Sequence, residues 1–251
     1  MSETLRVAVA QTDCAAVPRL ERIAALAERI CRESGPALIL FPELAAEGYD
    51  LSLGAQGLSA YWSDLALRLN VHLLAGVARQ EDGQRYDSAC CWDPTGRLLA
   101  EYRKIHLWGE EAACFQAGDT PMVLEIEGWK LGLLICADLG FPELSRKLCE
   151  AGDLDLLAVV SAWASPFGEL WNLCCRMRAW ENCCYLAAAN LWGSRGEASF
   201  CGLSQIYGPG GQLLGRCADG ENYLCLDLDK QAPAQCKAAL PWLKMRRPQL
   251  Y

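Results

Sequence analysis

Three side chains that could take part in covalent chemistry each stand at the end of a largely apolar, strand-like segment. The segments are "ALILFPE", which ends in Glu43, "LLAEYRK", which ends in Lys104, and "LGLLIC", which ends in Cys136. Active residues of α/β proteins collect at the carboxyl ends of strands. A strand that turns sharply into a helix can expose a nucleophile and direct backbone N–H groups at developing negative charge. The pattern therefore makes the thiol of Cys136 a candidate catalytic nucleophile.

Few groups could activate that thiol. The chain contains only 2 histidines, and His72 lies in the apolar run "VHLLAG", where we expect a core residue. His106 follows Lys104 by two residues, so in an extended chain both side chains point to one face, and a site role for His106 stays open. Because histidine is scarce, a carboxylate is the more plausible base.

The triplet Phe-Pro-Glu occurs twice, at 41–43 and 141–143, and supplies two candidate carboxylates. Glu43 directly follows an apolar strand, and the residues alone leave open whether it serves a site or only begins a helix. Glu143 comes directly after Pro142, which is typical of a first helical turn. An acidic side chain is favourable there because it opposes the helix dipole, so we expect Glu143 to be structural.

The composition limits the class of protein. The 251 residues are 52% hydrophobic and carry a net charge of −8, which favours one large core and disfavours nucleic-acid binding. The sequence shows neither an apolar run of about 20 residues nor a secretory signal, so we expect a cytoplasmic protein that does not enter a membrane. The 15 cysteines include no C-x-x-C pair, which argues against a zinc ribbon and against a thiol-rich redox or metal-storage protein.

The elements that must position these groups alternate along the chain. Helical periodicity predicts helices at 19–33, about 57–69, 142–152 and 169–182. The last of these is strongly amphipathic, with Leu170, Leu173, Cys174 and Met177 on one side. Apolar runs predict strands at 5–11, 37–41, 71–78, 184–190, 203–207, 212–215 and 223–228, and the turn "PTG" predicts a hairpin over 86–104. We expect one domain over residues 1–251, an α/β fold with mixed sheets packed on each other and helices outside.

Five segments resemble, in order, motifs of the carbon–nitrogen hydrolase (nitrilase) superfamily. The first three are "FPE" (41–43), "YRKIHL" (102–107) and "ICADLGFPELSR" (135–146). The likeness continues in "RMRAWENCCYLAAAN" (176–190) and "GLSQIYGPGGQLL" (202–214), so it covers residues 5 to 228. One such motif alone is a weak signal, whereas five in the right order are highly specific.

The resemblance implies an α-β-β-α sandwich that holds a Glu–Lys–Cys triad. It assigns Glu43 as the base, Lys104 as the lysine and Cys136 as the nucleophile that forms a thioester. Glu43 would move the thiol proton to the leaving nitrogen, and Lys104 would stabilise the oxyanion together with the N–H that follows Cys136. This chemistry is expected to use no metal ion and no cofactor.

Further residues follow from the same resemblance. Family members often carry a second glutamate that orients the lysine, and in "HLWGEEAACFQAGD" this is Glu111, with the adjacent Glu110 as the alternative. Ala137 stands after the nucleophile, where many relatives have a larger side chain, so its methyl group leaves the shape of the substrate open. Trp163 matches a pocket-lining position, although a buried core tryptophan is the competing interpretation.

The function implied is hydrolysis of a small linear amide or carbamoyl compound by an amidase-like member. A nitrilase acting on a small nitrile is the alternative within the enzyme class, and a non-catalytic scaffold that keeps the fold is the alternative outside it. The expected partner is a small-molecule amide or nitrile substrate. Relatives commonly form homodimers, so the resemblance also implies a homodimer or a higher homo-oligomer.

Overall fold

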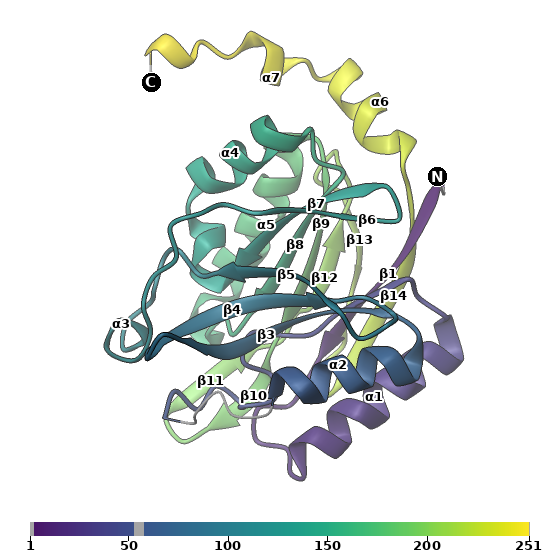
Figure 1. The fold of residues 1–251 in the computed structure, drawn as a ribbon. Coiled ribbons are helices and arrows are strands. Elements are labelled where there is room, and N and C mark those ends of the chain that lie inside the picture. Colours follow the sequence, from purple (N-terminus) through teal and green to yellow (C-terminus); the bar gives the residue numbers. More distant parts are fainter. Residues whose placement is uncertain (1–2, 53–57, 251) are drawn as a thin grey trace.

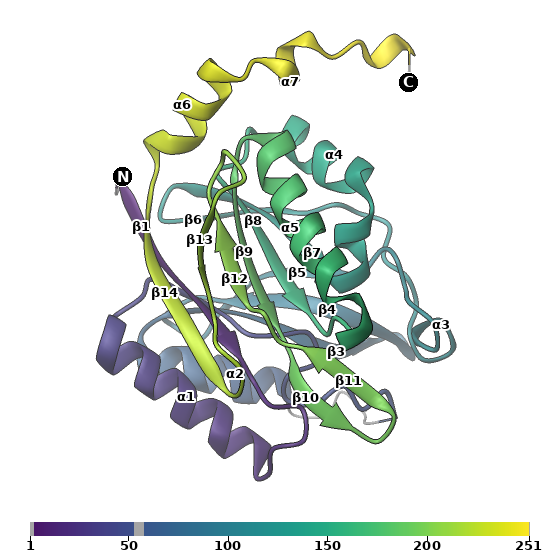
Figure 2. The same cartoon turned by 180° about the vertical axis from the view of Figure 1, so that it is seen from behind.

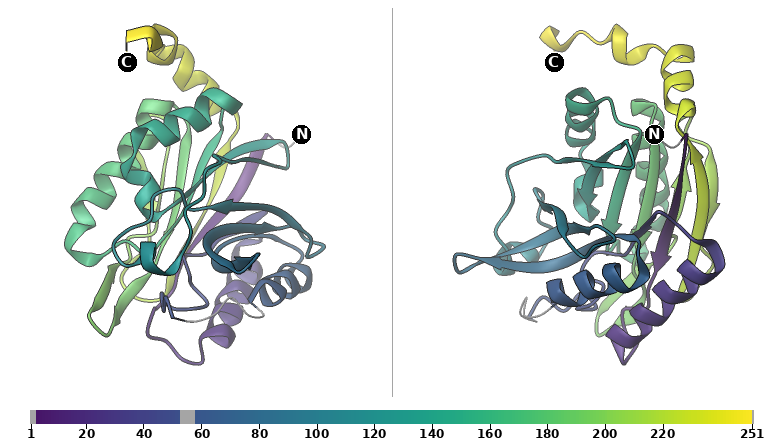
Figure 3. Two further views of the ribbon diagram at one scale, coloured as in Figure 1. Left: turned by 60° about the vertical axis from the view of Figure 1, so that its left-hand side comes forward. Right: turned by 45° about the vertical axis from the view of Figure 1, so that its right-hand side comes forward.

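The computed structural model describes residues 3–52 and 58–250 as two six-stranded sheets packed face to face, with helices on both outer faces (Figures 1 and 2). A smaller two-stranded sheet lies at one end. In the turned views of Figure 3, the purple and blue helices cover one sheet, and the teal and green helices cover the other. The α-β-β-α sandwich with mixed sheets is therefore confirmed.

The first sheet has the strand order β14-β1-β2-β3-β4-β5. The pairs β1–β2 and β2–β3 are parallel and the other pairs are antiparallel. Its strands are β1 (Thr4–Gln11), β2 (Leu38–Leu40), β3 (His72–Glu81), β4 (Gln84–Trp92), β5 (Leu98–Arg103) and β14 (Asn222–Asp229). Helices α1 (Arg19–Ser34) and α2 (Leu58–Leu69) cover its outer face. The expected helix start at residue 57 lies outside the described residues.

The second sheet has the strand order β13-β12-β9-β8-β7-β6 and is also mixed. The strands β7, β8 and β9 are parallel, with antiparallel strands on both sides. Its strands are β6 (Val123–Ile126), β7 (Trp129–Ile135), β8 (Leu156–Ser161), β9 (Tyr185–Asn190), β12 (Gln205–Tyr207) and β13 (Leu213–Arg216). Helices α4 (Pro142–Gly152) and α5 (Gly168–Asn182) cover its outer face.

The core explains why the strands that lead to the site are continuously apolar. In β7, Leu131, Leu133 and Ile135 pack between the two sheets, whereas Leu134 packs outward beneath α4 and α5. Successive side chains of a strand point to opposite faces, so a strand covered on both faces must be apolar at every position. Burial on both faces fixes the end of β7, and therefore Cys136, in the interior.

The orientation of α5 differs from the simplest interpretation of its sequence. Leu170, Leu173 and Met177 form an exposed side, with 52%, 55% and 40% of their surfaces accessible. The side toward the sheet carries Trp171 and Arg178 instead, and both have partners there. The Trp171 indole donates to the Leu203 carbonyl at 3.0 Å, and the Arg178 Nε donates to the Leu139 carbonyl at 3.0 Å. The burial and hydrogen bonds of Trp171 and Arg178 thus determine which side of α5 faces the sheet, and the side with the leucines is exposed.

Several elements were not expected from the sequence. A hairpin of β10 (Trp192–Arg195) and β11 (Ala198–Cys201) extends one end of the sandwich, and the short α3 (Glu111–Cys114) follows β5. At the other end a C-terminal arm of residues 231–250, with α6 (Gln231–Ala239) and α7 (Trp242–Met245), runs above the sandwich in Figure 1. Among the helices within residues 3–52 and 58–250, none is long and apolar enough to cross a membrane.

Candidate active site

Cys136 occupies a sharp turn between a buried strand and a helix. It directly follows β7 and begins a short 3-10 helix, Cys136–Gly140, which leads into α4. Its φ angle is 42°, in the left-handed region, and only 8% of its surface is accessible. A residue other than glycine held in that region costs about 1–3 kcal/mol, so the surroundings must stabilise this turn.

Asp138 supplies that stabilisation. Its carboxylate accepts hydrogen bonds from the Ile135 N–H at 3.1 Å, the Tyr102 hydroxyl at 2.7 Å and the His106 N–H at 3.0 Å. The His106 Nδ1 atom also lies 2.8 Å from Asp138 Oδ1, and the His106 ring stacks on the Phe141 ring with the ring centroids 3.6 Å apart. Asp138 thus joins the turn at Cys136 to β5 and the segment after it. His106 supports this junction, and His72 is buried beside the Ala37 carbonyl as expected.

Lys104 lies at the centre of a buried charge cluster. It follows β5 directly, and its side chain has no accessible surface. The Nζ atom donates to Glu43 Oε1 at 2.6 Å and to Glu111 Oε1 at 2.8 Å. These two carboxylates come from separate segments, one after β2 and one at the start of α3. The structure therefore brings Glu43, Lys104 and Glu111 together.

Glu43 is fixed by two donors and by a close approach of backbones. Besides the bond from Lys104, its Oε2 accepts the Ala162 N–H at 2.7 Å. A Cβ atom on Gly76 of β3 would lie 2.3 Å from the Glu43 Cα, so only glycine at position 76 lets the segment pass this close. The base proposed from sequence therefore has a defined orientation, whereas Glu143 lies exposed in the first turn of α4 as predicted.

The structure distinguishes the two adjacent glutamates after Lys104. Glu111 is fully buried against Lys104, while Glu110 is exposed. The Tyr49 hydroxyl donates to Glu111 Oε1 at 2.5 Å, and the Trp108 N–H donates to its Oε2 at 2.8 Å. Glu111 thus has the geometry that the resemblance expects of the second glutamate.

The protonation of the site follows from burial and charge. Burial raises the pKa of the Cys136 thiol well above its usual value, and the Glu43 carboxylate adds to this, while Lys104 and the Ser161 hydroxyl act in the opposite direction. Burial would lower the pKa of Lys104, but Glu43 and its other anionic neighbours outweigh burial and hold it well above the usual value. The resting site therefore contains a neutral thiol beside an ammonium, and a base must remove the thiol proton before attack.

The two residues suggested for substrate binding have different settings. Ala137 is half-buried directly after Cys136. Trp163 is also half-buried, but its indole N–H donates to the Phe167 carbonyl at 2.9 Å, and its backbone N–H donates to Asn190 Oδ1 at 2.7 Å. These contacts fit a packing role as well as a pocket wall, so both assignments stay predictions.

Sequence reasoning missed four residues of this site. The Tyr49 hydroxyl donates to Glu111, and the Ser161 hydroxyl opposes the rise in the pKa of Cys136. The Asp138 carboxylate stabilises the turn at Cys136, and Asp87 Oδ2 lies 3.6 Å from Lys104 Nζ. The signal that could have indicated Asp87 is its position as a lone acid beside the apolar run "SACCW" of a central strand. A hollow of about 500 Å³ borders the site at Tyr49.

Comparison with known proteins finds relatives that cover most of the chain. The sequence model of the carbon–nitrogen hydrolase family matches residues 6–238. A hydrolase encoded in the pqqF 5' region of Pseudomonas protegens is 34% identical, over 99% of this chain and 91% of that protein. The 2-oxoglutaramate amidase of Bacillus subtilis is 32% identical, over 85% of this chain and 86% of its own length.

Solved structures of similar fold cover almost the whole chain. A mutant of the amidase from Nesterenkonia sp. AN1, with acrylamide added to its active-site cysteine, has a TM-score of 0.84 at 30% identity, over 95% of this chain and 98% of that one. A carbon–nitrogen hydrolase from Helicobacter pylori G27 has a TM-score of 0.90 over 99% of this chain and 97% of that one. Its identity of 24% makes it evidence for the fold alone.

Proposed function

The chain belongs to the carbon–nitrogen hydrolase family, and from that premise we propose that it is an amidase that cleaves small linear amides or carbamoyl compounds through a thioester at Cys136. The observation that carries the proposal is the buried Lys104 ammonium, held by Glu43 and Glu111 at 2.6 and 2.8 Å, whose charge acts on the Cys136 thiol. Two of the similar proteins are named as amidases, which supports an amide as the substrate.

In the acylation step, the Cys136 Sγ attacks the amide carbon while its proton passes to Glu43. The carbonyl oxygen becomes an oxyanion, which the Lys104 ammonium and the Ala137 N–H stabilise. Such donors are effective because burial keeps them oriented and poorly screened before the reaction begins. Glu111 positions Lys104 and carries no proton in this step.

The tetrahedral intermediate then collapses to the thioester. The C–N bond breaks, and Glu43 returns its proton to the leaving nitrogen, which departs as ammonia or an amine. Glu43 next removes a proton from water as the water attacks the thioester carbon. The C–S bond breaks, Glu43 returns this proton to the Cys136 thiolate, and the carboxylic acid leaves. Ala137 and Trp163 are proposed to border the acyl group, with the small side chain of Ala137 leaving room for it.

A screen for ammonia release tests the function. Wild-type protein should release ammonia from one or more small amides or carbamoyl compounds, and turnover of nitriles alone would favour a nitrilase instead. The Cys136→Ser variant should be inactive, because a carboxylate base ionises a serine hydroxyl far less readily than a thiol. Cys174→Ser on α5 is the matched control and should keep its activity. A folded Cys136→Ser variant with wild-type turnover, or a wild type inactive on every compound, would contradict the proposal.

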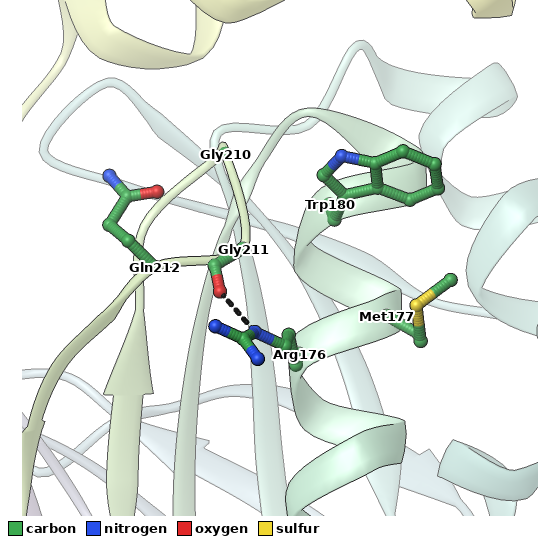
Figure 4. A pocket seen from close by; sticks show the side chains of 6 residues that line it. All are labelled: Arg176, Met177, Trp180, Gly210, Gly211 and Gln212. Carbon is green, nitrogen blue, oxygen red and sulfur yellow. Dashed lines mark hydrogen bonds between the residues drawn. The ribbon is translucent and has the colours of Figure 1, made fainter.

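We also propose that the chain forms a homodimer through α5. Its exposed side carries Leu170, Leu173, Met177 and Trp180, and large exposed apolar patches mark association sites. A hollow of about 440 Å³ lies beside this helix. Figure 4 shows the residues that line it, which are Arg176, Met177, Trp180, Gly210, Gly211 and Gln212. The single-domain organisation and the cytoplasmic location stay predictions from sequence.

A further inference from the structure

Asp87 is a third acidic neighbour of Lys104, and the mechanism above does not use it. It lies on β4 with a fully buried side chain, and its Oδ2 is 3.6 Å from Lys104 Nζ, which is too far for a hydrogen bond. Within residues 3–52 and 58–250, neither of its carboxylate oxygens accepts a hydrogen bond. A buried ionised carboxylate without donors is strongly unfavourable. Its place in the site therefore requires an explanation.

The charges around Lys104 do not balance if every carboxyl group is ionised. Glu43, Asp87 and Glu111 each offer an oxygen, and these oxygens lie within 4.8 Å of one another. Three carboxylates and one ammonium would leave two negative charges in a buried site. Like charges at this distance hold at least one carboxyl group in its protonated form. One proton therefore belongs to the cluster, and the hydrogen bonds decide which residue holds it.

Glu43 and Glu111 each accept hydrogen bonds from Lys104 and from a backbone N–H. Glu43 accepts from Lys104 and from the Ala162 N–H, each through a different oxygen. Burial and the charge on Glu43 raise the pKa of Glu111, but Lys104 and the Trp108 N–H oppose that rise.

Asp87 lacks donors of this kind. Burial first, and then the Glu43 carboxylate, raise the pKa of Asp87 well above its usual value, against the opposing charge of Lys104. Glu43 acts on it both as a charge and as a hydrogen-bonding neighbour. A proton on Asp87 would remove one of the two excess negative charges and turn a carboxylate without donors into a hydrogen-bond donor.

We propose that Asp87 is a neutral carboxylic acid that donates a hydrogen bond to Glu43 and so positions the base. The groups that face it are Glu43 from the segment after β2, Lys104 from the end of β5 and Glu111 from α3. A neutral Asp87 keeps a second excess negative charge away from Cys136, where it would oppose formation of the thiolate. The catalytic consequence rests on the proposed function, but the protonation state does not.

Variants of Asp87 separate positioning from packing. Asp87→Leu keeps the number and branching of the side-chain heavy atoms and removes the donor, and should lower kcat about ten-fold, the usual effect of one lost hydrogen bond. Asp87→Asn supplies an N–H donor that cannot ionise, so it should restore most of that loss. In wild type, ionisation of Asp87 should lower the activity at alkaline pH, and Asp87→Asn should not show this fall. If Asp87→Asn is folded but no more active than Asp87→Leu, an ionised carboxylate is required and the proposal is wrong.

Infrared spectroscopy of protein labelled with ¹³C-aspartate tests the protonation state without any substrate. Wild type at pH 7 should show the carbonyl band of a protonated aspartic acid, and Asp87→Asn should lose it. Asp93→Asn is the control. Hydrogen bonds, mainly from Thr95 and also from Arg97, lower the pKa of Asp93 to about 2, so Asp93 is ionised at pH 7 and its replacement should leave the band unchanged. Absence of the band in wild type would overturn the proposal. If the band is present but no amide is hydrolysed, the proposed function fails and the assignment of Asp87 stands.

Discussion

Glu43 and Glu143 end the same triplet but occupy opposite environments. Glu43 has no accessible surface and accepts hydrogen bonds from Lys104 and the Ala162 N–H. Glu143 is exposed in the first turn of α4. The difference comes from what precedes each triplet, since the first directly follows a strand buried on both faces and the second follows a short 3-10 helix.

Changing each acid to its amide tests the proposed base. Glu43→Gln should lower kcat by about 10²–10⁴, the usual effect of losing general-base catalysis, because an amide cannot accept the thiol proton. Glu143→Gln should leave kcat within a few-fold of wild type. It should cost about 0.3–1 kcal/mol of stability, because it removes a favourable charge at a helix N-terminus. Steady-state ammonia release and thermal unfolding measure both effects, and the opposite ranking of the two kcat values would exclude Glu43 as the base.

The central side chains of the site could be anticipated from the sequence, but their supports could not. Motif order indicated Glu43, Lys104, Cys136 and Glu111, and the structure brings the three charged residues together. Asp87 escaped notice because its significance depends on the distance to Lys104, and spacing along the chain does not report that distance. Catalytic roles for these residues stay predictions until variants are measured.

At the scale of elements, the segment between β2 and α2 places charged groups inside the protein. Besides Glu43 it carries Glu47, which is 1% accessible and accepts the Ala78 N–H of β3 at 2.8 Å. Burial raises the pKa of Glu47 from 4.5 to about 7, although the Ala78 N–H opposes this rise. The segment therefore contains a group that changes its charge near neutral pH.

Glu47 should make the stability of the protein depend on pH. The folded-state pKa of Glu47 is raised, so its protonated form favours the folded protein. This contribution to the free energy of unfolding is fully present below the unfolded pKa and is lost as the pH rises through about 7. Glu47→Gln cannot ionise, so its free energy of unfolding should exceed that of wild type by up to about 3 kcal/mol at pH 8. The two proteins should converge near pH 4.5. Urea unfolding at both pH values measures this, and an equal difference between the proteins at both would contradict a raised pKa.

Continuous apolar runs predicted the central strands well, because burial on both faces demands such runs. The hairpin of β10 and β11 was missed because its sequence, "WGSRGEASFC", is short, polar and rich in glycine. The orientation of α5 was not predictable because Trp171 and Arg178 take the inner side through hydrogen bonds to distant carbonyls. Local pattern thus predicted where elements lie better than which way they face.

At the scale of the whole molecule, the sandwich covers its sheets but leaves one helix face apolar and accessible. The leucine side of α5 points away from the second sheet. Near its end, the Trp180 ring packs against Trp242 of the C-terminal arm, with the ring centroids 4.6 Å apart. Figure 2 shows the arm continuing above α4 and α5 rather than closing over them. This face is the surface on which the homodimer is proposed.

A charge on α5 tests that assembly. Wild type should have twice the 27.5 kDa mass of one chain in light scattering after size exclusion, and Leu173→Glu should shift it toward one chain. Leu67→Glu on α2 is a matched control, since Leu67 and Leu173 are both 55% accessible, and it should keep the wild-type mass. A Leu173→Glu variant with the mass of wild type would show that α5 is not the interface.

Catalysis is proposed to pass through a thioester on Cys136. Wild type mixed with an amide that it hydrolyses, then quenched in acid during turnover, should carry the acyl group on the peptide that contains Cys136, as mass spectrometry after proteolysis would show. The other 14 of the 15 cysteines should remain unmodified, and Glu43→Gln should accumulate no acyl group. An acyl group on a different residue, or rapid turnover during which no Cys136 adduct forms even with a substrate that hydrolyses slowly, would contradict the mechanism.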